Sequence, residues 1–176
     1  MEKISVVYPI GKFSPIKTYN DALIKEWITE IDTLPKRFSN LVKDLPDSDL
    51  DKPLREGAWS VRQLVHHMAD SHHHSYTRFK WTLTEPEPLI KAFDEVAWSA
   101  LNDSDAPVKL SLDHLSAVHG KWVYLLKKMD PETLSKRFKH PHSMEFQHLF
   151  NTLGAYAWHG NHHLQQIKNA LNNKDE

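Results

Sequence analysis

The chain has 176 residues, of which 40% are hydrophobic and 26% are charged, and its formal net charge is -1. This size and composition are ordinary for a globular protein, so we expect one domain over residues 1–176. A nucleic-acid or acidic-membrane partner needs a clear basic excess, and no apolar run approaches the roughly 20 residues of a membrane span. We therefore predict no nucleic acid, no membrane and, without a signal-like start, a cytoplasmic location.

The chain contains no cysteine and thirteen histidines. The lack of cysteine excludes disulfides, thiolate zinc sites and a cysteine nucleophile. Any metal ion must therefore be held by histidine and carboxylate side chains, which suit zinc, nickel, copper, manganese or iron(II).

Helical periodicity dominates the chain and predicts four long amphipathic helices. The first helix covers about residues 17–43, and Pro35 could kink it. The second helix follows Ser60, which is a good N-cap with Gln63 as its capping-box partner, and extends to about Leu83. After the first helix, the segment from Leu45 to Asp49 is expected to break the helical pattern and lead into a loop.

The third and fourth helices are predicted over residues 110–128 and 146–171, with a fraying tail over residues 172–176. The remaining segments are a connection over 89–107 with a short helix near 94–101, a helical turn opened by Pro131, and a loop or short hairpin over 138–145. Together these elements predict an all-α four-helix bundle with a long crossover connection. Metal sites in such bundles are built from side chains on facing helices.

Two histidine clusters, at residues 66–74 and 159–163, lie about ninety residues apart in the sequence. His159 and His163 are four residues apart, so on a helix they share one face and can hold one metal ion. A third ligand must come from elsewhere, and the first cluster is the obvious supplier. Such a site keeps coordination positions open for water or substrate. The competing interpretation is a pair of hydrogen-bonded histidines without a metal.

The periodicity of the second helix leaves the third ligand open. His72 falls nearest the centre of the apolar stripe and His67 lies at one edge, which mildly favours His72. The other histidines of that cluster, and His162 in the second, are expected to point toward solvent. Gly160 stands where the zincin motif carries its glutamate base, which argues against a metalloprotease.

The segment from Trp59 to His72 resembles the second-helix signature of the DinB-like superfamily, and more closely that of its YfiT group of provisionally named metal-dependent hydrolases. Further segments are similar to that group in the same order, so that the resemblance covers nearly the whole chain: Tyr8–Phe13, Ser75–Lys80, Asp94–Trp98, His119–Trp122 and Tyr156–Leu164. Residues 140–145 follow the group only in part, because an acidic residue is common there where His142 or Ser143 stands.

The resemblance implies a bundle that binds one divalent metal ion per chain through His67, His159 and His163. Its choice of His67 goes against the mild preference of periodicity for His72. Ligand type favours zinc or nickel, with manganese and iron(II) behind them. Members of the family are often homodimers, so we also expect a homodimer.

Two reactions suit such a site, and both predict a small-molecule substrate. The first is hydrolysis, in which the metal activates water for attack on an ester or amide. The alternative is transfer of a low-molecular-weight thiol held as a thiolate, because related DinB-like proteins are thiol S-transferases. A metal-binding bundle without catalysis is the third interpretation. The acidic residues Asp70, Asp94 and Glu95 are candidates for a general base only because they lie near these motifs.

Overall fold

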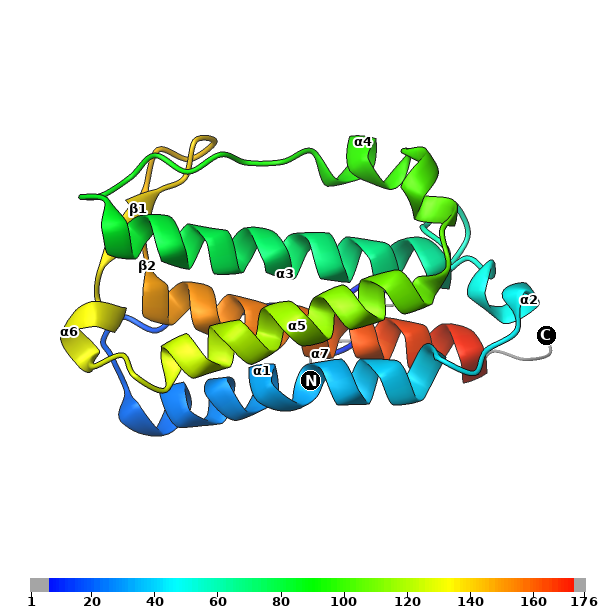
Figure 1. Cartoon of the computed structure of the whole chain (residues 1–176), viewed down its shortest axis with the longest axis horizontal. Helices are drawn as coiled ribbons and strands as arrows, with labels where there is room; N and C mark the ends of the chain where they lie inside the picture. Colours follow the sequence, from blue (N-terminus) through cyan, green and yellow to red (C-terminus); the bar gives the residue numbers. More distant parts are fainter. Residues whose placement is uncertain (1–6, 173–176) are drawn as a thin grey trace.

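The computed structural model describes residues 7–172, and four long helices dominate it (Figure 1). The long helices are α1 (Asp21–Val42), α3 (Val61–Thr84), α5 (Val108–Leu126) and α7 (Leu149–Asn172). The short elements are α2 (Asp47–Leu50), α4 (Glu95–Ser99), the 3-10 helix η1 (Asn102–Asp105), α6 (Pro131–Leu134), β1 (Arg137–Lys139) and β2 (Phe146–His148). The predicted four-helix bundle is confirmed, while the tail from residue 173 lies outside the described residues.

The long helices pack around the bundle in the order α1, α5, α3, α7. Helix α3 packs mainly against α5 and α7, and α1 packs mainly against the same two helices. The segment that leaves α3 passes back along that helix before α5 begins (Figure 1), and it contains α4 and η1, both in contact with α3. As a result α3 and α5 run in the same direction, as a long crossover requires. The contact between α3 and α7 brings the two histidine-rich helices together.

Local signals explain where these helices begin. The hydroxyl of Ser60 accepts a hydrogen bond from the Gln63 N–H, and the Gln63 side chain accepts one from the Ser60 N–H, as the predicted capping box requires. Helix α1 begins later than predicted because Asn20 is its N-cap. The side-chain oxygen of Asn20 accepts hydrogen bonds from the N–H groups of Ala22 and Leu23. Helix α7 begins at Leu149, three residues later than predicted, because β2 pairs with β1 in a hairpin. Residues 47–50, predicted as a break and loop, form one helical turn.

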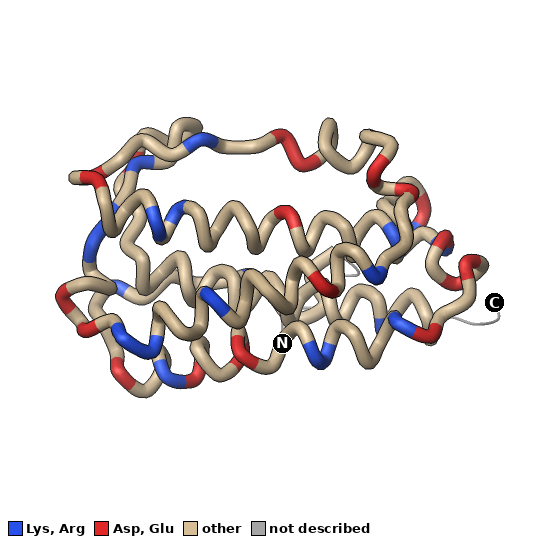
Figure 2. Tube along the Cα trace, in the orientation of Figure 1, with Lys and Arg blue, Asp and Glu red and all other residues tan. Residues whose placement is uncertain are grey.

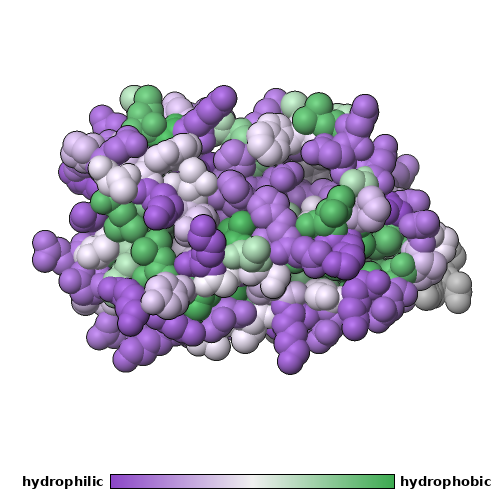
Figure 3. All heavy atoms as spheres, in the orientation of Figure 1, coloured by the Kyte–Doolittle hydropathy of each residue, from purple (hydrophilic) through white to green (hydrophobic). Residues whose placement is uncertain are grey.

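The outer surface carries charges of both signs. Figure 2 shows acidic and basic residues interspersed along the helices, and Figure 3 shows a largely hydrophilic face with scattered apolar side chains. Leu110 and Tyr124 of α5 are among the exposed large apolar residues. Within residues 7–172, none of the helices combines the length and the apolar character needed to cross a membrane.

Gly160 allows α7 to approach α1 closely, beside two of the candidate ligands. A Cβ atom at this position would lie 2.9 Å from Cδ1 of Leu34, whose side chain is buried in the core. We expect Gly160→Ala to lower the free energy of unfolding by about 1–3 kcal/mol through overpacking, in spite of the better helix propensity of alanine. Urea unfolding measures this change.

Gly120 of α5 supplies the matched control. It also lies inside a helix, but a Cβ atom there meets no atom within 4 Å. Gly120→Ala should therefore raise the free energy of unfolding by about 0.5–1 kcal/mol. Equal stability changes in the two variants would show that the α1–α7 contact is not tight at Gly160.

Candidate metal centre

His67 of α3 faces His159 and His163 of α7 across the contact between these helices. Nε2 of His159 lies 3.0 Å from Nε2 of His163 and 3.4 Å from Nε2 of His67. One ligand atom from each of the three side chains lies within 4.8 Å of the others. Two imidazole nitrogens bound to one ion at about 2.05 Å are roughly 2.9–3.3 Å apart for angles of 90–109°. The 3.0 Å distance falls in this range and the 3.4 Å distance lies just above it, so the group is close to the arrangement that one metal ion requires.

The structure brings together the three histidines implied by the family resemblance and leaves His72 outside their group. His72 is fully buried, as its central place in the apolar stripe predicts. Its Nε2 lies 3.3 Å from Nδ1 of His159, on the side of that ring that faces away from the other ligand nitrogens. His72 therefore contacts the candidate ligand His159 and does not join the group of three.

A chain of hydrogen bonds fixes the tautomer of His159. Pro35 lies inside α1 and has no N–H, so the carbonyl of Ile31 lacks its usual helical donor. Nδ1 of His119 lies 2.6 Å from that carbonyl oxygen and must donate to it, because a carbonyl only accepts. Nε2 of His119 then accepts from Nδ1 of His72 at 2.8 Å, and Nε2 of His72 accepts from Nδ1 of His159. We therefore assign the free lone pair of His159 to Nε2.

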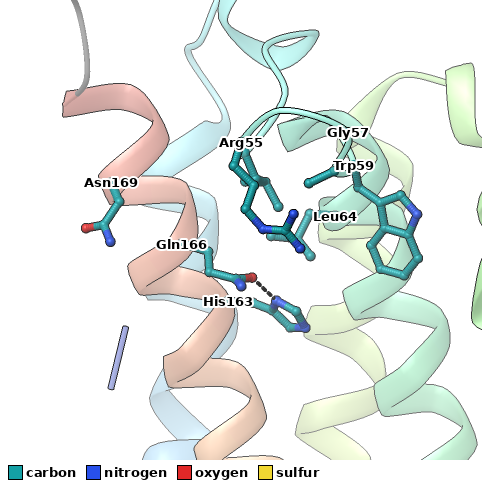
Figure 4. A pocket seen from close by; sticks show the side chains of 9 residues that line it. Arg55, Gly57, Trp59, Leu64, His163, Gln166 and Asn169 are labelled. Atoms are coloured by element: carbon teal, nitrogen blue, oxygen red, sulfur yellow. Dashed lines mark hydrogen bonds between the residues drawn. The ribbon is translucent and has the colours of Figure 1, made fainter. Parts of the chain in front are cut away.

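His163 is fixed in the same tautomer by Gln166 (Figure 4). The side-chain amide nitrogen of Gln166 donates to the carbonyl of Val7 at 3.2 Å, which turns its Oε1 toward Nδ1 of His163 at 2.8 Å. Nε2 of His163 therefore also carries a lone pair. Its 3.0 Å contact with Nε2 of His159 joins two acceptors and cannot be a hydrogen bond. A cation between these nitrogens removes the repulsion, so the donor set fits a metal ion.

Burial keeps the three candidate ligands neutral. It lowers the pKa of His67 to about 4 and that of His163 to about 3. Burial holds the pKa of His159 well below its usual value, and unfavourable electrostatic interactions with the neighbouring histidines lower it further. No carboxylate belongs to this group within the described residues. A divalent ion bound here would keep its full charge, which strengthens its effect on a bound water or carbonyl.

The three histidines lie in the wall of a cavity of about 690 Å³. Much of the remaining wall is aromatic, and its other polar members are drawn from α3, α7, α4 and the β1–β2 loop: Ser71, Arg78, Glu95, His140, His142 and Tyr156. Of the three acidic candidates, only Glu95 lines this cavity. The side chain of Asp94 caps α4 instead.

Comparisons with known proteins place this fold in a family. A model of the DinB superfamily matches residues 14–167 of the chain. The chain belongs to the DinB superfamily. A DinB relative from Bacillus mycoides is 46% identical over 160 residues, which are 91% of this chain and 92% of the relative. Another from Oceanobacillus iheyensis is 42% identical over 168 residues, 96% of this chain and 97% of the relative. Both carry the provisional name of a metal-dependent hydrolase.

The solved structure of YfiT from Bacillus subtilis matches with a TM-score of 0.92 and 40% sequence identity. The match covers 95% of this chain and 96% of that chain. YfiT is described as a probable metal-dependent hydrolase with an unusual four-helix bundle topology. The crossover arrangement of this DinB bundle is thus shared with a solved relative.

His66 and His162 were predicted to point toward solvent, but both are buried in this DinB bundle. His66 is buried beneath the crossover, where its ring nitrogens contact Ser111 and the carbonyl of Ala106. His162 is buried against Trp158, at 4.7 Å between ring centroids, and Tyr8 of the N-terminal segment lies 5.8 Å from it. Helical periodicity depends only on the sequence of the helix itself. It therefore cannot show that a distant segment covers the outer face.

Of the other two histidines of the first cluster that were predicted to point toward solvent, one is exposed and one is not. His73 is exposed as predicted, beside His114. His74 is half-buried instead, because Phe93 of the crossover stacks on its ring at 4.3 Å. Sequence reasoning also missed Gln166 and Arg78 of this DinB chain. Only the spacing of Gln166, three residues after His163 on one helix, could have indicated a role.

Proposed function

We propose that this chain is a metal-dependent hydrolase in which His67, His159 and His163 bind one divalent metal ion. The observation that carries the proposal is the convergence of their Nε2 atoms, two of which are fixed as acceptors, at the wall of a large cavity. Three uncharged nitrogen ligands favour zinc or nickel. The substrate is a small ester or amide that fits the cavity.

The described side chains have different roles in the proposed hydrolysis. When bound, a divalent ion lowers the pKa of its water, to about 7 in the best zinc cases, and polarises a substrate carbonyl. Hydrogen bonds from His159 to His72, and from His163 to Gln166, hold the ligand rings in place. Aromatic side chains, among them Trp59 and Phe93, make much of the cavity wall apolar. The carboxylate of Glu95 is the only one lining it among residues 7–172, so it is our candidate to accept the proton of the attacking water.

A panel of small esters and amides tests this proposal, with zinc- or nickel-loaded protein and no added thiol. We expect release of acid that stops when a chelator removes the metal and resumes when the metal is restored. The same protein is then given a low-molecular-weight thiol and an electrophile. Turnover only in the presence of the thiol would replace the hydrolase by an S-transferase. Retained metal without turnover in either assay would indicate a binding protein.

A further inference from the structure

Arg78 is a buried cation in the wall of the same cavity. It follows His67 by eleven residues on α3, which at about 100° per residue places both on one face of the helix. Only 9% of the residue is exposed. Its Nη1 donates to the hydroxyl of Tyr156 at 3.3 Å, and its Nε is buried without a hydrogen-bond partner. None of the ion pairs within residues 7–172 involves Arg78.

An arginine in this state is costly for the fold. A buried charge loses its hydration and is normally compensated by a carboxylate and by hydrogen bonds to its remaining donors. The hydrogen-bond partner of Arg78 is one neutral hydroxyl, that of Tyr156, and at least one N–H group of the guanidinium has no partner. A packing role does not require a charge, so the missing partner indicates a ligand that supplies a negative charge.

None of the described neighbours of Arg78 compensates its positive charge. Arg78 is the only lysine or arginine among the described residues that line the cavity. Burial, followed by the nearby charge of Arg78, lowers the pKa of His140 and brings that of His74 to about 4, so these rings stay neutral at pH 7. Glu95 also lines the cavity, but among the ion pairs of residues 7–172 none joins it to Arg78. The described residues therefore supply no negative charge to compensate that of Arg78.

We propose that Arg78 and Tyr156 form a subsite that binds a carboxylate group of the substrate. A planar guanidinium with free donors matches a carboxylate, and its single positive charge balances one negative charge better than the two of a phosphate. The rings of Tyr156 and His159 lie 5.7 Å apart, so the subsite is one side chain away from the candidate metal centre. The inference rests on the proposed function for the reaction, and it assigns the substrates to small esters or amides that carry a carboxylate.

Titration of the metal-loaded full chain with benzoate tests the subsite without any turnover. Arg78→Met removes the charge and keeps much of the side-chain volume, and we expect benzoate to bind at least about tenfold more weakly to it than to the wild type. Lys80→Met removes an exposed cation from the same helix and should bind benzoate like the wild type. Because each protein carries the metal, direct coordination of benzoate to the metal cancels in the comparison.

Equal benzoate affinity in Arg78→Met and the wild type, or no binding to either, would overturn the subsite. Tighter binding of phenyl phosphate than of benzoate would overturn the choice of a carboxylate. Thermal unfolding distinguishes a ligand-binding role of Arg78 from a packing role. If Arg78 served packing, its replacement would destabilise the protein, whereas we expect Arg78→Met to be as stable as the wild type or more stable. If Arg78→Met does not fold, Tyr156→Phe removes the second donor and should weaken benzoate binding severalfold.

A pair of substrates connects the subsite to the reaction. Phenyl acetate and 4-acetoxybenzoate share the reacting ester and differ only in the carboxylate. We expect the wild type to prefer 4-acetoxybenzoate in kcat/KM, and Arg78→Met to lose at least about tenfold of this preference. An unchanged preference contradicts the subsite. If neither ester is hydrolysed but benzoate binding still depends on Arg78, the proposed hydrolase fails and the carboxylate subsite stands.

Discussion

Lowering the pH from 6.5 to 5 is expected to destabilise the metal-free chain steeply. Histidines at the centre of the bundle have pKa values lowered mainly by burial: His67, His72, His119, His159 and His163. In the unfolded chain each has a pKa near 6.5, whereas burial lowers that of folded His119, for example, to about 4. The unfolded state therefore binds protons first as the pH falls. Stability is fully present above pH 6.5 and declines by about 1.4 kcal/mol per pH unit for each histidine that stays neutral.

Urea unfolding at several pH values between 7 and 5 measures this slope, in a range above the ordinary pKa of carboxyl groups. His119→Gln keeps a polar side chain of similar size but removes one titrating group. Its slope should be lower than that of the wild type by about 1.4 kcal/mol per pH unit below pH 6. An unfolding free energy that is the same at pH 7 and pH 5 would contradict the burial of neutral imidazoles.

His72→Phe is expected to weaken metal binding by about 10- to 100-fold while leaving one ion bound per chain at saturation. The phenyl ring fills the same space but removes both hydrogen bonds that His72 makes, to His119 and to His159. The His159 ring then loses the acceptor that fixes its Nδ1–H and directs its Nε2 lone pair toward the metal. Partners of this kind orient ligands and raise their basicity, which is why their loss reduces affinity without abolishing the site.

Competition with a chromophoric chelator measures that affinity. His73→Phe is the matched control, because it makes the same change at the next position of α3, where the side chain is exposed. We expect its affinity for zinc to equal that of the wild type. The same affinity in His72→Phe and His73→Phe would show that the hydrogen-bond chain from Ile31 to His159 does not support the ligand.

Much of the fold could be predicted because its signals are local. Periodic apolar residues indicate the four long helices, and the capping box at Ser60 places the start of α3 to the residue. The start of α7 could not be placed in the same way. The apolar Phe146 fits a helical pattern, but pairing of β2 with β1, which depends on a distant segment, holds it in a strand.

The same distinction between local and long-range signals applies to the candidate site. The four-residue spacing of His159 and His163 is local, so the pair could be found in the sequence. The choice between His67 and His72 depends on the register between α3 and α7, which periodicity does not contain, and only the family resemblance indicated His67. Pro35 could be recognised as a helix irregularity, but its effect depends on α5, because the carbonyl it frees is taken by His119.

Metal content per chain, measured by elemental analysis, tests the central claim most directly. The samples are the wild type, His67→Ala, His159→Ala and His163→Ala, each loaded with zinc or nickel and freed of excess, with the exposed His73→Ala as control. We predict about one ion per chain in the wild type and His73→Ala, and almost none in the three ligand variants. A full metal complement in any of the three variants would contradict the proposed three-histidine site.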